Sequence, residues 1–146
     1  MYYFASDIHL GLHIGSDPEN RERLLVQWLD EVSKDADAIF LVGDIFDFWY
    51  EYRYVVPKGF TRLLGKLSEL TDRGIPVHFF GGNHDIWTYR YLHDECGVTL
   101  YHSPYTEFEL DGRKVIVGHG DMLGPRPAGQ RILSAIFRSR LLQWLF

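Results

Sequence analysis

The sequence predicts an α/β fold with a parallel sheet, because short apolar runs typical of buried strands alternate with stretches of helical periodicity. A length of 146 residues suits one domain and is too short for two. With 46% hydrophobic and 24% charged residues, the composition is that of a globular protein. Cys96 is the single cysteine, which excludes an internal disulfide or a CxxC zinc site and favours a reducing compartment such as the cytoplasm.

Two strands and a helix are predicted in the first part of the chain. Residues 2–5 and 38–42 are short apolar runs, as expected for strands buried in a parallel sheet. Between them, Asp17 and Pro18 provide an N-cap and a first-turn proline for a helix. The apolar residues that recur at helical spacing after this start are Leu24, Leu25, Trp28, Leu29 and Val32.

A second helix and a third strand follow. The apolar stripe of the helix consists of Phe60, Leu63, Leu64, Leu67 and Leu70. Gly74 and Pro76 end this helix before a strand over residues 77–80. The resulting strand–helix–strand–helix–strand order predicts parallel pairing. Residues 86–93 then predict a short aromatic helix.

The last third of the chain combines a hairpin with a basic, apolar tail. Asp111-Gly112 is a strong turn signal between predicted strands over residues 105–110 and 113–117. From residue 128 to residue 146 the apolar residues recur at helical spacing, which indicates an amphipathic helix. Four of the 15 basic residues and none of the 20 acidic ones lie in residues 122–146. The tail therefore fits either an anionic lipid surface or an ordinary core-facing helix with solvated arginines.

Clusters of polar residues follow four of the predicted strands. Each cluster alone is compatible with an ordinary turn or a helix cap. Because ligands bind outside the carboxyl ends of strands in α/β sheets, we expect all four to converge on one site. The clusters are Ser6-Asp7-Ile8-His9, Gly43-Asp44-Ile45-Phe46-Asp47, Gly81-Gly82-Asn83-His84-Asp85 and Gly118-His119-Gly120-Asp121.

The order of these clusters resembles that of the calcineurin-like metallophosphoesterases, over nearly the whole chain. The motifs DxH, GDxxD, GNHD and GH follow one another as in that superfamily. Within it, residues 6–10, 43–49, 96–100 and 112–121 resemble the UDP-2,3-diacylglucosamine pyrophosphatases of lipid A synthesis. The resemblance implies a β-sandwich flanked by helices and the hydrolysis of a phosphoanhydride, which gives UMP and a lipid 1-phosphate.

The resemblance also implies a site for two divalent metal ions, usually manganese. Asp7 and His9 would bind the first ion, Asp44 would bridge both, and Asn83 and His119 would bind the second. Oxygen and imidazole ligands suit Mn²⁺, and two such ions can hold a phosphoryl group for in-line displacement.

Two further residues are expected to act in catalysis. In the wider superfamily the histidine of GNHD, here His84, neutralises charge in the transition state or protonates the leaving oxygen. Asp85 would orient it. The pyrophosphatases usually carry arginine in place of His84, so another phosphatase or phosphodiesterase activity is the alternative.

The superfamily also completes its site with a GHxH motif, and no HxH occurs in these 146 residues. We interpret residues 1–146 as the N-terminal portion of one metallophosphoesterase domain that lacks its C-terminal part, with residues 128–146 as a helix of a lid or insertion. We therefore expect the chain as given to bind metal weakly and to turn over slowly. A non-catalytic interaction protein of this fold is a further alternative.

The expected partner is a small-molecule phosphoanhydride, either free or linked to lipid. The acidic body of the chain is poorly suited to nucleic acid. We expect a cytoplasmic protein with peripheral contact to the inner membrane. The aromatic residues between positions 46 and 54 suit two roles, in binding a uridine base or acyl chain or in packing the core.

Overall fold

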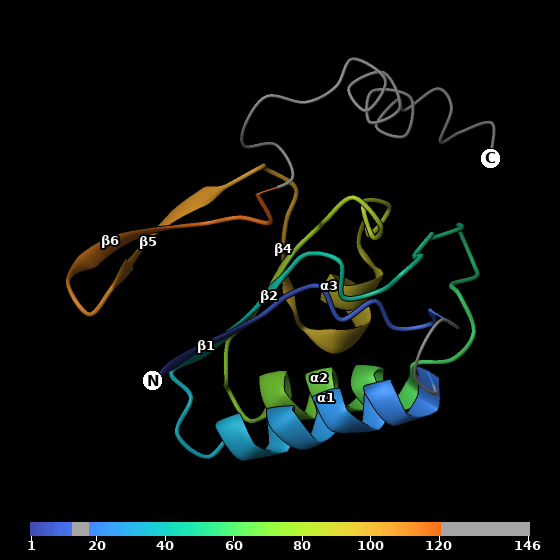
Figure 1. Ribbon diagram of the computed structural model, residues 1–146, viewed down its shortest axis with the longest axis horizontal. Coiled ribbons are helices and arrows are strands. Elements are labelled where there is room, and N and C mark those ends of the chain that lie inside the picture. The colour runs from blue at the N-terminus through green and yellow to red at the C-terminus, as the bar shows by residue number, and fades with distance from the viewer. Residues whose placement is uncertain (13–17, 121–146) are drawn as a thin grey trace.

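The computed structural model describes residues 1–12 and 18–120, and it shows the predicted mixed α/β fold (Figure 1). The helix predicted over residues 128–146 and the predicted N-cap Asp17 lie outside the described residues. In chain order the elements are β1 (Tyr2–Ala5), α1 (Pro18–Val32), β2 (Ala38–Val42), α2 (Thr61–Asp72), β3 (Val77–Phe80), α3 (Tyr91–Cys96), β4 (Thr99–Tyr101), β5 (Thr106–Leu110) and β6 (Arg113–Val117).

Four parallel strands form the main sheet, in the order β1-β2-β3-β4. The parallel pairing predicted from the alternation of strands and helices is therefore confirmed. Strand β2 lies inside the sheet, where Ile39, Phe40 and Leu41 are fully buried. All four strands end at the same edge, so the loops that follow them are brought together.

The helices cover one face of this sheet. Alternate residues of β2 and β3 point to this face, as the two-residue period of a strand requires. Figure 1 shows α1 and α2 side by side along it. The buried side chains that join these helices to the sheet include Leu25, Leu29, Leu63, Leu67, Ile39, Leu41, Val77 and Phe79.

The hairpin of β5 and β6 packs on the opposite face as a second, antiparallel sheet. Phe40, Phe80 and Val117 are buried between the two sheets. The ring of Phe108 on β5 meets the ring of Phe40 edge to face, with centroids 5.1 Å apart. This packing fixes the position of the residues that follow β6.

A carboxylate of α1 sets the start of α2. Phe60, which precedes α2, has a left-handed backbone (φ 58°) and makes no side-chain cap. The buried Glu22 instead accepts hydrogen bonds from the N–H groups of Arg62 and Leu63, at 3.0 and 3.1 Å. These amides have no partner within the helix, so Glu22 satisfies them from the neighbouring helix.

The short helix predicted over residues 86–93 is wrong in its position, because α3 begins at Tyr91. Glu51 accepts hydrogen bonds from the N–H groups of Arg90 and Tyr91, at 2.7 and 3.0 Å, and this contact sets the start of the helix. Residues before it form a loop in which Trp87 pairs with Tyr50. The three-residue strand β4 was not predicted.

Among the described residues, no helix is long and apolar enough to cross a membrane.

Replacing Phe40 by alanine should lower the free energy of unfolding by about 3–5 kcal/mol, since this fully buried ring packs in both the sheet and the interlayer cluster. Urea unfolding followed by circular dichroism measures the effect. Phe4→Ala is the matched control, because the Phe4 ring stacks on Phe40 but is 47% exposed. Equal losses in the two variants would contradict the assignment of Phe40 to the core.

Candidate metal centre

The loops after β1 and β2 continue to pair beyond the ends of the strands. The N–H of Asp7 donates to the carbonyl of Gly43 at 3.1 Å, and the N–H of His9 donates to the carbonyl of Asp44 at 2.9 Å. These bonds hold three of the expected ligands, Asp7, His9 and Asp44, at the carboxyl edge of the sheet.

The same three residues have an unusual backbone. Their φ angles are 55° for Asp7, 50° for His9 and 53° for Asp44, in the left-handed region that residues with a side chain seldom adopt. Such conformations cost energy and persist where the surroundings impose them, often at functional sites. The three residues with this strained backbone are thus the ones that the DxH and GDxxD motifs single out as ligands.

At two positions only glycine fits, because a side chain of the site lies directly against the backbone. A Cβ atom at Gly43, where φ is 77°, would lie 2.5 Å from the ring of His119. A Cβ atom at Gly82 would overlap the carboxylate of Asp44. Any larger residue at either position would therefore displace a candidate ligand.

Asp85 is fully buried and binds the loops after β2 and β3 together. Its carboxylate accepts four backbone hydrogen bonds, from Ile45 (2.8 Å), Gly82 (2.7 Å), Asp44 (3.3 Å) and Phe46 (3.3 Å). Burial raises the pKa of Asp85 above its usual value, although the amide donors favour the charged form. The Asp85 carboxylate therefore binds the backbone of the two loops that carry Asp44 and His84.

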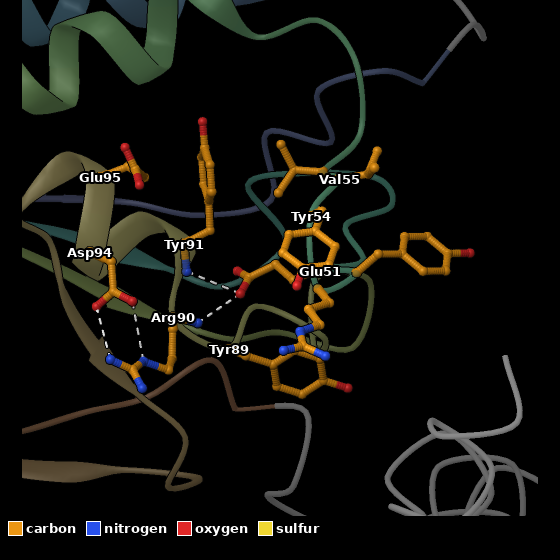
Figure 2. A pocket seen from close by; sticks show the side chains of 11 residues that line it. Glu51, Tyr54, Val55, Tyr89, Arg90, Tyr91, Asp94 and Glu95 are labelled. Atoms are coloured by element: carbon orange, nitrogen blue, oxygen red, sulfur yellow. Dashed lines mark hydrogen bonds and ion pairs between the residues drawn. The ribbon is translucent and has the colours of Figure 1, made fainter.

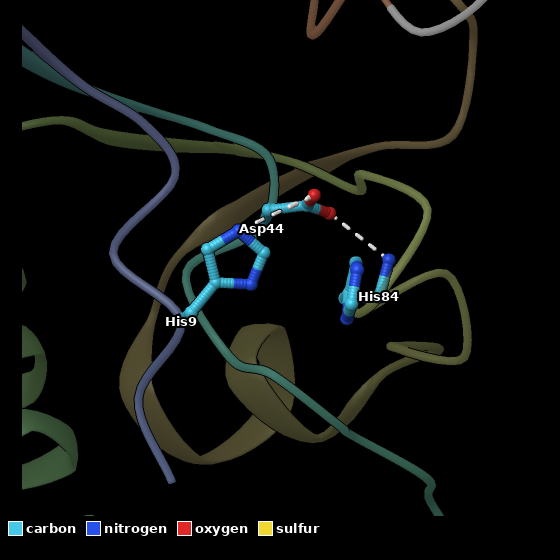
Figure 3. Close-up of side chains that lie close together, drawn as sticks. All are labelled: His9, Asp44 and His84. Carbon is cyan, nitrogen blue, oxygen red and sulfur yellow. Dashed lines mark hydrogen bonds and ion pairs between the residues drawn. The ribbon is translucent and has the colours of Figure 1, made fainter. Parts of the chain in front are cut away.

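The carboxylate of Asp44 lies at the centre of the site, with His9 and His84 on either side of it (Figure 3). Its Oδ1 accepts a hydrogen bond from the N–H of His84 at 2.9 Å. Its Oδ2 lies 3.4 Å from Nε2 of His119 and 3.9 Å from Nε2 of His9. Burial opposes the ionisation of Asp44, but the bonds from His119 and His84 hold its pKa below the usual value.

His119 is oriented by the backbone of β2. Its Nδ1 lies 3.0 Å from the carbonyl oxygen of Val42. Because a carbonyl only accepts, Nδ1 carries a proton and Nε2 is directed at Asp44. The hydrogen bond with Asp44 raises the pKa of His119 to about 9 despite its burial.

Asp47 contacts the His84 ring, a role that we expected for Asp85. Nδ1 of His84 donates to the carbonyl oxygen of Asp47 at 2.9 Å and lies 3.3 Å from Oδ1 of that residue. The same Oδ1 is 3.3 Å from Nδ1 of His9, which is buried and lacks a well-aligned hydrogen bond. The GDxxD motif contains Asp47, but its spacing gives no indication of this contact.

The donor atoms form two groups that share Asp44. His9, Asp44 and His84 make one group, and Asp7, Asp44 and His119 make the other, with ligand atoms within 4.8 Å of one another in each. We expected Asp7 and His9 to share an ion, whereas here they fall in different groups.

The residues fit divalent cations. The donors are carboxylate oxygens and imidazole nitrogens, which suit Mn²⁺ and similar ions, and the buried Nδ1 of His9 lacks a hydrogen bond. Asn83 is exposed and lies beside His84 in the loop after β3.

A separate pocket of about 700 Å³ lies between the loop after Asp47 and α3. The aromatic residues expected to bind substrate or to pack are divided: Phe46 and Trp49 are buried in the core, whereas Tyr52 and Tyr54 line this pocket. Figure 2 shows side chains that line it, among which Arg90 pairs with Asp94 and Glu51 accepts hydrogen bonds from the N–H groups of Arg90 and Tyr91. No residue that lines it belongs to either group of metal-site donors.

Comparisons with known proteins identify the family. The family model described as calcineurin-like phosphoesterase matches residues 2–137. A protein of Porphyromonas gingivalis named UDP-2,3-diacylglucosamine hydrolase is 50% identical over 82% of this chain and 45% of its own length. A protein of Aeromonas salmonicida with the same name is 32% identical over 98% of this chain and 54% of its own length. The chain thus spans about half the length of these relatives.

A solved structure has the same fold. It is a protein of unknown function, AQ665, from Aquifex aeolicus, with a TM-score of 0.53 and 16% identity over 94% of this chain and 72% of its own. At this identity the likeness concerns the fold alone.

In the metal-free protein, the contact between His119 and Asp44 should make stability depend on pH. The pKa of His119 is about 9 when folded and 6.5 in its ordinary state, so the folded chain holds the proton more tightly. The stabilisation is complete below pH 6.5 and is lost as the pH rises through about 9. Urea unfolding in the presence of a chelator, at intervals across this range, measures it. The variant His119→Gln should show a flatter profile, and an unchanged profile would contradict the ion pair.

Proposed function

This chain belongs to the calcineurin-like phosphoesterase family, and from that premise we propose that the protein is a metal-dependent hydrolase of a phosphoanhydride. The proposed substrate is UDP-2,3-diacylglucosamine, with UMP and 2,3-diacylglucosamine 1-phosphate as products. The names of the curated relatives support this substrate. The observation that carries the proposal is the pair of donor groups that share Asp44 at the carboxyl edge of the sheet.

Two divalent ions, which we propose to be Mn²⁺, would be held by the five residues found in the motifs. These are Asp7, His9, Asp44, Asn83 and His119, with Asp44 common to both ions. All but Asn83 belong to the two donor groups, and we assign His84, the remaining member of those groups, to proton transfer. When bound, such ions polarise the phosphoryl oxygens and make an attacking water more acidic.

The protein's own side chains would orient the reaction and move a proton. Asp44 is kept charged by its neighbours, and its Oδ1 is fixed by the N–H of His84. Nδ1 of His84 donates to Asp47, and we assign to Nε2 of the doubly protonated ring the transfer of a proton to the leaving oxygen, which leaves the ring neutral. Asp85 would act through the backbone bonds that hold both loops.

One alternative is a different phosphatase or phosphodiesterase of the same family. It is favoured by His84, since the pyrophosphatases that the chain resembles usually have arginine there. A non-catalytic protein of this fold is favoured only by the absence of an HxH motif from the 146 residues. Measuring the metal content and the turnover of a generic phosphodiester distinguishes the non-catalytic protein from the pyrophosphatase and from the alternative phosphodiesterase.

The substrate class suggests where the protein works. A diacylated sugar nucleotide resides at a membrane surface, so we propose a cytoplasmic protein that touches the inner membrane peripherally. The basic apolar tail of residues 128–146 is the part of the sequence suited to that contact.

The roles of Asp44 and His84 differ in a measurable way. In the full-length protein, Asp44→Ala should remove both metal binding and activity, because this carboxylate belongs to both donor groups. His84→Ala should lower kcat by roughly 10²–10⁴-fold with metal still bound, as expected on loss of a general acid. Metal analysis and initial rates on the same samples decide the matter.

His93→Ala, on α3 and outside both donor groups, is the control. If His84→Ala also loses its metal, His84 is a ligand rather than a proton donor.

The substrate is tested by competition. UDP-2,3-diacylglucosamine and UDP-glucose are offered to the full-length protein at equal concentration, and we expect a clear preference for the acylated substrate. Acyl chains bury apolar surface worth roughly 25 cal/mol per Å², which UDP-glucose cannot provide. Equal kcat/KM values for the two would favour the alternative phosphodiesterase.

A further inference from the structure

The carbonyl group of His9 is held by a side chain from the helical layer. Arg21, near the N-terminus of α1, donates from Nη1 to the carbonyl oxygen of His9 at 2.7 Å. The N–H of Leu12 donates to the same oxygen at 3.2 Å. A guanidinium is always charged, so its bond to a carbonyl is stronger than one between neutral groups.

This contact acts on a backbone that is not in its preferred conformation. His9 has a φ angle of 50°, and its Nε2 lies 3.9 Å from Oδ2 of Asp44, so a change in this backbone would move the ring relative to that carboxylate. In the left-handed region such a residue needs external contacts to stay in place. Arg21 supplies one of them from outside the loop.

The part of α1 that carries Arg21 is held in place by its neighbours. The next residue, Glu22, is buried and binds the first amides of α2, and Leu25 and Leu29 pack in the core. Arg21 therefore extends from a rigid part of α1 to the loop after β1.

We propose that Arg21 is a positioning residue of the metal centre, which holds the His9 loop in the conformation that presents its imidazole to a cation. The inference rests on the proposed function in one respect, that His9 is a metal ligand. The hydrogen bond of Arg21 to His9 is made with the backbone carbonyl and not with the imidazole, so the expected effect on catalysis is indirect. Groups that orient a metal ligand from outside typically affect metal affinity or activity 10–100-fold.

The test is to titrate the full-length protein with Mn²⁺ alone and to measure the binding affinity by isothermal titration calorimetry. Arg21→Met removes the donor and keeps much of the apolar stem, and we expect it to weaken the binding of at least one ion by about 10-fold. Arg21→Lys, which retains a charged donor but not the planar fork, should fall between Arg21→Met and the wild type. Arg23→Met is the matched control, since Arg23 lies on the same helix and pairs with Glu19 at the surface.

Thermal unfolding of the metal-free proteins separates positioning from support of the fold. A positioning role predicts a loss of Mn²⁺ affinity that is larger in Arg21→Met than in Arg23→Met at a similar metal-free Tm. Unchanged affinity in Arg21→Met overturns the inference and leaves the metal centre intact. If Arg21→Met does not fold, unchanged affinity in Arg21→Lys overturns it. A wild-type protein that binds no Mn²⁺ instead overturns the proposed function.

Discussion

The arrangement of the site depends on one buried carboxylate, that of Asp85. Removing a carboxylate from water is costly unless its oxygens receive hydrogen bonds, and here four backbone amides provide them. Those amides belong to the loops after β2 and β3, and each would be left unsatisfied without Asp85, at about 1–3 kcal/mol apiece. The two loops are consequently fixed relative to each other before any ligand binds. The position of Asp44, between Gly82 and the N–H of His84, follows from this constraint.

Much of the fold could be predicted because its signals are local. Strand β2 is continuously apolar since it is buried on both faces, and the hairpin has a two-residue turn whose sequence favours it. The start of α3 could not be predicted in the same way. It is determined by Glu51, which is distant in sequence and satisfies the first amides of the helix. A window of sequence contains no information about such a partner.

The site shows the same division between what is local and what is not. Polar residues at the ends of parallel strands must gather at one edge, so this rule accounts for the approach of Asp7 and Asp44. His119 follows the antiparallel strand β6 and reaches them through the packing of the second sheet. Which carboxylate faces which ring depends on three-dimensional packing. Asp85 turns back to the loop after β2, and Asp47 occupies the place beside His84. The bond between α1 and the His9 loop leaves no motif at all.

His119 differs from the other donors in belonging to the second sheet, since it follows β6, yet its ring packs directly over Gly43 at the end of β2. A cation held by Asp44 and His119 would join the two layers as a cross-link joins two strands. Elsewhere the layers are held by aromatic packing around Phe40. Without the cation, this end of the sandwich is still held by the contacts of His119 with the Val42 carbonyl and with Asp44, so a bound ion would reinforce a junction that the protein already makes.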